Sequence, residues 1–110
     1  MKKLLLFVLI SIFGGYSFSQ VPNPPSLIYP LDSTQICTTT PTFVWSPVTG
    51  ATSYRIQVSK HPNFDTLVLD VGGLTNSGYQ TPTGNLNYNN TYYWRVNATG
   101  TGGTSNWSIV

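Results

Sequence analysis

Few side chains in this chain of 110 residues could perform chemistry. There is one histidine, His61, there are three aspartates, and glutamate is absent. His61 could form a hydrolytic triad with a serine and an aspartate, but no G-x-S-x-G turn presents a nucleophilic serine. A pair of glycosidase carboxylates would have to come from three scattered aspartates. We therefore expect no catalytic site, and we interpret His61, next to Pro62 in a predicted turn, as a solvated loop residue.

Metal, cofactor and phosphate sites are equally unsupported by the sequence. A zinc site needs several cysteine or histidine ligands, and the chain has one of each. Asp65 and Asp70 lack the dense spacing of oxygen ligands that calcium loops have. The glycine-rich stretch VGGLTNSG is not followed by the lysine of a phosphate-binding loop. We therefore expect neither a metal nor a cofactor.

Residues 1–19 have the layout of a secretory signal peptide. Two lysines precede the apolar run LLLFVLISIF of ten residues, and glycines and serines follow it. A membrane anchor is disfavoured, because this run is about half of the roughly 20 residues that span a bilayer. With cleavage between Ser19 and Gln20, the pattern predicts a secreted or cell-surface protein without a membrane span.

Removal of the signal peptide would leave a nearly neutral chain. Its two lysines account for the net charge of +2. The remaining charged residues balance: they are Arg55, Lys60 and Arg95 against Asp32, Asp65 and Asp70. Nucleic-acid binding requires a basic stripe, so this balance argues against a nucleic-acid partner.

The single cysteine, Cys37, excludes an internal disulfide, although exported proteins normally reach an oxidising compartment. Cys37 either pairs with a thiol on another chain or is a half-buried small residue without a role, and we favour the second interpretation. The domain must then be stabilised by its apolar core alone.

Short strands must position these side chains, because no stretch shows helical periodicity. PTFVWSPV, TSYRIQVSK and TYYWRVNA alternate between apolar and polar residues, which places one set toward a core. The apolar set is Phe43, Trp45, Tyr54, Ile56, Val58, Tyr92, Trp94 and Val96. Residues 20–25 are proline-rich and are interpreted as a linker that enters an edge strand near Leu27 to Tyr29. Turn residues separate the runs, so we predict six or seven short strands in an antiparallel β-sandwich.

These stretches together resemble a known family. PTFVWSPVTGATSYRIQVS, followed by LNYNNTYYWRVNATGTGGTSNWS, is similar to a fibronectin type III domain of bacterial secreted proteins, over about residues 24–110. The resemblance implies an all-β, immunoglobulin-like β-sandwich of about seven strands, which we place at residues 26–110. It also implies that Leu86 and Tyr92 are the family's conserved leucine and corner tyrosine, with the phenol bonded to a backbone carbonyl upstream. We assign structural roles to both and to Trp45, Tyr54, Ile56, Val58, Trp94 and Val96.

The resemblance further implies an incomplete last strand. In similar domains a W-S-x-V segment precedes that strand, whereas here the sequence ends with Trp107 to Val110. We therefore expect a C-terminally truncated domain from a longer protein. In such a fragment, the strand around Tyr92 to Ala98 would lack hydrogen-bond partners along much of its length.

The outward face of two strands that are neighbours in the type III layout is a possible binding patch. It consists of Arg55, Gln57, Tyr93 and Arg95. Aromatic and guanidinium groups on a flat sheet can bind a glycan or another protein. Ordinary cross-strand pairing would explain the same residues, and we favour that explanation.

Two functional hypotheses of different class follow. The first is a non-catalytic extracellular module that acts as a spacer, display or adhesion domain. Its partners would be neighbouring domains, another protein or a surface glycan. The alternative is an accessory module of a secreted hydrolase whose catalytic domain lies beyond this fragment. The sequence encoded downstream of Val110 would distinguish the two.

Overall fold

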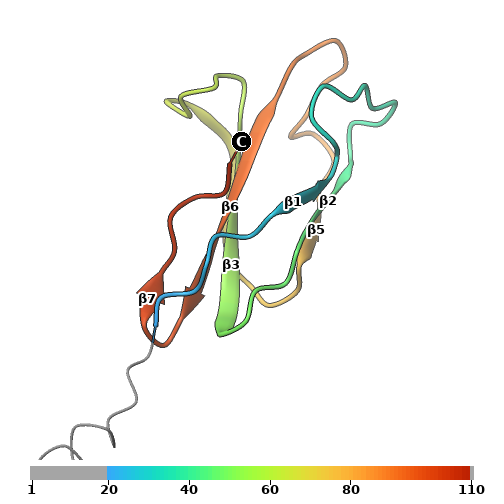
Figure 1. Ribbon diagram of the computed structural model, residues 1–110. Coiled ribbons are helices and arrows are strands. Elements are labelled where there is room, and N and C mark those ends of the chain that lie inside the picture. Colours follow the sequence, from blue (N-terminus) through green and yellow to red (C-terminus); the bar gives the residue numbers. More distant parts are fainter. Residues whose placement is uncertain (1–19, 110) are drawn as a thin grey trace, which may run out of the picture.

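The computed structural model describes residues 20–109, and the predicted signal peptide lies outside them. The described chain forms seven strands and contains no helix (Figure 1). The strands are β1 (Leu27–Tyr29), β2 (Thr42–Trp45), β3 (Ala51–Ser59), β4 (Leu67–Leu74), β5 (Gly78–Gln80), β6 (Tyr93–Gly100) and β7 (Gly103–Thr104). Consequently, no described segment is a helix long and apolar enough to cross a membrane.

The strands form two antiparallel sheets. One has three strands in the order β1-β2-β5, and the other has four in the order β4-β3-β6-β7. The buried cluster draws side chains from both sheets, so their inner faces enclose one core. This arrangement confirms the predicted immunoglobulin-like β-sandwich.

The core follows the period-two alternation of the strands. Trp45, Ile56, Val58 and Val96 each have 0% exposure, and they come from β2, β3 and β6. Arg55 and Gln57 alternate with them on the outer face, since successive side chains of a strand point to opposite faces. Ser59 and Asn97 also adjoin core residues in sequence, but they are buried. The core also includes Phe43, Tyr54, Leu69, Leu86 and Ala98, with Tyr92 and Trp94 packed against it.

Aromatic contacts join the two sheets. The rings of Phe43 on β2 and Trp94 on β6 have centroids 4.8 Å apart, and those of Trp45 and Tyr54 are 5.7 Å apart in an edge arrangement. Tilted and edge contacts of this kind are the preferred geometries of aromatic pairs. The indole Nε1 of Trp45 is buried without a hydrogen-bond partner among the described residues.

Two tyrosine hydroxyls hold turns in place. The Tyr92 hydroxyl accepts a hydrogen bond from the backbone N–H of Asn87 at 2.9 Å, and Leu86 beside it is buried. The partner is therefore an N–H group and not the carbonyl that the resemblance implied. A second, unanticipated contact has the same form: the Tyr54 hydroxyl accepts from the backbone N–H of Val48 at 3.0 Å.

Tyr92→Phe is expected to lower the free energy of unfolding by about 1 kcal/mol, the typical net value of one hydrogen bond. The loss should be moderate because Asn87 is exposed, so that water can replace the hydroxyl. Urea denaturation measures it. Tyr88→Phe is the matched control, since Tyr88 is 62% exposed in the same loop. Equal midpoints for the two variants would show that the Tyr92 hydroxyl does not stabilise the loop.

The proline-rich stretch 20–25 packs against the sandwich. Pro22 and Pro25 are buried, and Pro22 lies beside Gly100 at the end of β6. In Figure 1 the stretch runs past β7 toward β1. Residues interpreted as a linker therefore cover part of the four-stranded sheet, and we call them the N-terminal strap.

Pairing along β6 continues past the two residues of β7. The backbone N–H groups of Ser105 and Ser108 donate to the carbonyls of Ala98 and Val96, at 2.7 and 2.8 Å. In return, the two serine hydroxyls accept from the N–H groups of Ala98 and Val96, at 2.9 and 3.0 Å. The expectation that β6 lacks partners along much of its length is therefore wrong for Val96 and Ala98. Here serine hydroxyls accept the hydrogen bonds that the backbone carbonyls of a neighbouring strand would normally accept. The alternation of apolar and polar residues gives no sign of this.

We call the pairing of Ser105 and Ser108 with Ala98 and Val96 the serine clasp. The spacing of the two serines creates a bulge in it. Three steps along the C-terminal segment match two steps along β6, whereas regular antiparallel pairing would match two with two. The extra residue redirects the side chains between the serines. Trp107 consequently contacts Arg95 of β6, on the outer face of the sheet.

Candidate functional site

The outer face of the four-stranded sheet carries the charged residues that could form a site. Arg55 on β3 forms a two-pronged ion pair with Asp70 on β4, with nitrogen–oxygen distances of 2.7 and 2.9 Å. Gln57, also on β3, accepts hydrogen bonds from Nε and Nη2 of Arg95 at 3.0 and 2.8 Å. The Gln57 amide nitrogen donates to Asp70 at 3.4 Å, which links the two arginines into one network.

Arg95 lies between two aromatic rings. Its guanidinium carbon is 4.2 Å from the ring centroid of Phe64 and 4.3 Å from that of Trp107. Attraction between the cation and each ring face stabilises this stack. Burial lowers the pKa of Arg95, and the carboxylate of Asp70 acts in the opposite direction. Arginine nevertheless remains charged at any ordinary pH.

The structure thus brings together three of the four residues of the predicted patch, Arg55, Gln57 and Arg95. Tyr93 lies on the same strand as Arg95, two residues before it. The three polar side chains bond to one another and to Asp70, as expected from cross-strand pairing. A ligand would have to compete with these contacts, and binding at the patch stays a prediction.

Sequence reasoning missed Phe64 and Trp107. Phe64 is buried and has a φ of 56°, a left-handed conformation that is rare for an aromatic residue. The position of Phe64 depends on the bend at His61–Phe64 in the β3–β4 turn, and that of Trp107 depends on the serine clasp. Both contacts arise between segments distant in sequence, so no local pattern could have indicated them.

His61 lies in the β3–β4 turn, as predicted, and its Nδ1 contacts the carboxylate of Asp65. Both side chains are exposed. The nearby Ser59 is fully buried, and its hydroxyl donates to the carbonyl of Thr66 at 2.6 Å. The three residue types of a triad therefore meet in one turn, but the serine hydroxyl already has a backbone acceptor, which does not suit a nucleophile.

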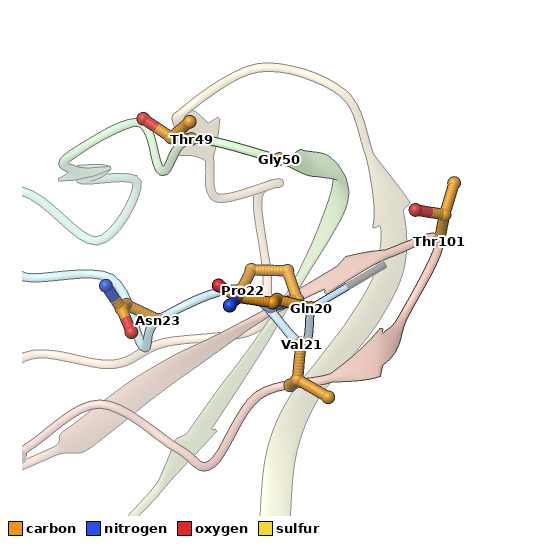
Figure 2. Close-up of a pocket in the computed structure, with 7 residues that line it drawn as sticks. All are labelled: Gln20, Val21, Pro22, Asn23, Thr49, Gly50 and Thr101. Atoms are coloured by element: carbon orange, nitrogen blue, oxygen red, sulfur yellow. The ribbon is translucent and has the colours of Figure 1, made fainter. Parts of the chain in front are cut away.

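Other candidate positions carry little chemistry. Within residues 20–109, no group of three or more potential metal ligands comes together. Cys37 is exposed in the β1–β2 loop and not half-buried. An open hollow of about 410 Å³ lies beside the N-terminal strap, and Figure 2 shows its residues. It is lined by Gln20, Val21, Pro22, Asn23, Thr49, Gly50 and Thr101, none of which is charged.

Acid should weaken the Arg55–Asp70 pair. The hydrogen bond from Arg55 lowers the pKa of Asp70 below its ordinary value of about 3.9. The folded chain therefore holds the ionised form better than the unfolded chain does. This stabilisation is present above about pH 4 and is lost as the pH falls through the lowered pKa. The effect should be small, because both side chains are partly exposed.

Urea midpoints between about pH 5 and pH 2 would test this expectation. Asp70→Asn should reduce the acid dependence, whereas Asp32→Asn, in the exposed β1–β2 loop, should retain it. The pair between His61 and Asp65 would still contribute to the acid dependence in both variants, since the hydrogen bond from His61 also lowers the pKa of Asp65. An Asp70→Asn protein with the acid dependence of the parent would contradict the assignment.

Comparison with known proteins supports the fold. No curated protein sequence matches the chain. Among solved structures, a Fn3-like protein from Clostridium thermocellum is similar, with 26% sequence identity and a TM-score of 0.58. The match covers 84% of this chain and 88% of that one. Residues 29–110 match the model of the Rha78A-like, N-terminal immunoglobulin domain. The chain therefore belongs to the family of Rha78A-like N-terminal immunoglobulin domains, a family of the immunoglobulin and fibronectin type III fold.

Proposed function

We propose that this protein is a non-catalytic extracellular module that holds or spaces neighbouring domains. The observation that carries the proposal is the family match, because the family is described as an N-terminal immunoglobulin domain, and an N-terminal domain implies others after it. The outer sheet face supports it, since Arg55 already bonds to Asp70 and Arg95 to Gln57 within the domain. A display or adhesion role would use the same surface.

An assay of residues 20–110 against a panel of chromogenic glycosides and esters tests the non-catalytic role. We expect no turnover above buffer. His61→Ala and Ser59→Ala are the informative variants, because these residues share the turn with Asp65. Turnover by the parent that either variant abolishes would overturn the proposal.

The second candidate is an accessory module of a secreted hydrolase. The family description favours a position ahead of another domain, which such a module would occupy. The sequence encoded after Val110 distinguishes the candidates: a catalytic domain there supports the accessory role, and further non-catalytic modules support the spacer.

Export is part of the proposal and rests on residues 1–19. N-terminal sequencing of the protein secreted by a bacterial host should begin at Gln20. A mature protein that retains Lys2 and Lys3 would contradict export through a cleaved signal peptide.

A further inference from the structure

The antiparallel pairing gathers several loops at one end of the sandwich. Thr42 at the start of β2 pairs with Gln80 at the end of β5, so the β1–β2 loop and the β5–β6 connection begin side by side. Ser59 at the end of β3 pairs with Tyr93 at the start of β6, which adds the β3–β4 turn. The C-terminal segment runs toward the same end of β6. Figure 1 shows these loops near the C label, and we call this region the C-terminal end.

The C-terminal end exposes large apolar side chains from separate segments. Leu31 in the β1–β2 loop is 67% exposed, Tyr88 in the β5–β6 connection is 62% exposed, and Ile109 is 92% exposed. Ile28 and Tyr29 of β1, which leads into this end, are 48% and 44% exposed. At the opposite end, Val21 is the one large apolar residue in the described chain with comparable exposure, at 49%.

The two loops that carry Leu31 and Tyr88 are nearly uncharged. Residues 30–41 and 81–92 contain one charged side chain, Asp32. The charged groups of this end, Lys60 and Asp65, lie in the β3–β4 turn. Single exposed apolar residues are common on any protein surface, but a group of them on nearly uncharged loops is typical of an interaction surface. Domain interfaces within one chain bury only about 600–1,500 Å², so a modest surface is sufficient.

We propose that the C-terminal end docks against the domain that follows this one in the polypeptide. The inference rests on the proposed function. The family's N-terminal position puts the next domain after residue 109, and the C-terminal segment leads to this same end. A short connection would hold the next domain close to Leu31 and Tyr88, so a modest apolar contact would be sufficient. The docking surface of that domain should be apolar with uncharged polar groups at its rim.

Hydrogen–deuterium exchange on the protein encoded by the complete gene tests the proposal. Backbone amides in residues 30–41 and 81–92 should exchange about tenfold more slowly there than in the isolated chain 20–110, as expected for protection worth about 1.4 kcal/mol. Amides of residues 46–50 and 101–102, at the opposite end, should exchange equally in both. The double variant Leu31→Ser with Tyr88→Ser should abolish the protection, and the matched control Val21→Ser should not.

The outcomes distinguish the hypotheses. Both variants replace exposed side chains, so the isolated chains should melt like the parent and a folding defect would be visible separately. Equal exchange in the complete and isolated proteins would overturn the docking surface and leave the spacer role intact. Protection of the isolated chain that rises with its concentration would assign the surface to a second copy, which also overturns the proposal. A gene that encodes no further domain would instead contradict the proposed function.

Discussion

Replacing Gly100 with alanine is expected to destabilise the domain by about 3 kcal/mol, the upper part of the usual range for overpacking. An added Cβ would lie 2.3 Å from the backbone oxygen of Gly50 and 3.1 Å from Cγ of Pro22. The oxygen belongs to the main chain of the β2–β3 turn, so no side-chain rotation can relieve the contact. The turn or β6 must move, which would also disturb the N-terminal strap.

Thermal and urea unfolding of Gly100→Ala would measure this loss. Gly72→Ala is the matched control, because its added Cβ meets only the flexible side chain of Arg55, at 3.0 Å. We expect a small change for Gly72→Ala and a large one for Gly100→Ala. Comparable stability of the two variants would show that the turn and β6 are farther apart than described.

Trp45→Ala should have the largest effect, a loss of about 3–5 kcal/mol, as is typical when a buried aromatic residue is truncated. Trp45 has 0% exposure and its ring contacts Tyr54 across the core. Small domains have about 5–15 kcal/mol of total stability, so this variant should be close to unfolding at ambient temperature.

Trp45→Phe distinguishes the contribution of the aromatic ring from that of the indole nitrogen, because it keeps a ring in the core and removes the nitrogen. Because Nε1 of Trp45 has no partner, the substitution removes no hydrogen bond and should cost clearly less than Trp45→Ala. Denaturant midpoints followed by the fluorescence of the remaining tryptophans measure both. If Trp45→Phe were as damaging as Trp45→Ala, the indole N–H must have a partner, such as a bound water, that contributes to stability.

The sequence predicted the parts of this fold that depend on local pattern. Alternation along β2, β3 and β6 identified Trp45, Ile56 and Val96 as inward-facing, because burial on one face of a strand imposes period two. The turn residues indicated short strands, and the stretch around Leu86 and Tyr92 indicated the fibronectin type III fold. Each of these signals lies within about ten residues of chain, where a physical rule links sequence to structure.

The parts that were missed depend on contacts that no local pattern indicates. Nothing in the stretch around Phe64 shows that its ring will cover Arg95, since that contact needs a left-handed backbone conformation and the β3–β6 pairing. The serine clasp depends on hydroxyls that replace carbonyls, which hydropathy does not detect. The candidate patch was recognisable as a set of outward residues. Its internal bonding was not, because Asp70 joins it from a third strand.

The serine clasp has a mechanical consequence. The N-terminal strap and the C-terminal segment leave the sandwich at opposite ends, so tension between them would act along the strands (Figure 1). Hydrogen bonds that are perpendicular to the strands are loaded in shear by such a force. They must therefore break together and not one after another. The strap enters through Ser26, whose carbonyl accepts from the N–H of Ser46 at 2.8 Å and whose N–H donates to the Ser46 hydroxyl at 2.9 Å. The other end is held to β6 by two backbone bonds and two serine hydroxyls. A serine hydroxyl therefore reinforces the backbone pairing at both points where a pulling force would enter the sandwich, at the end of β2 and on β6.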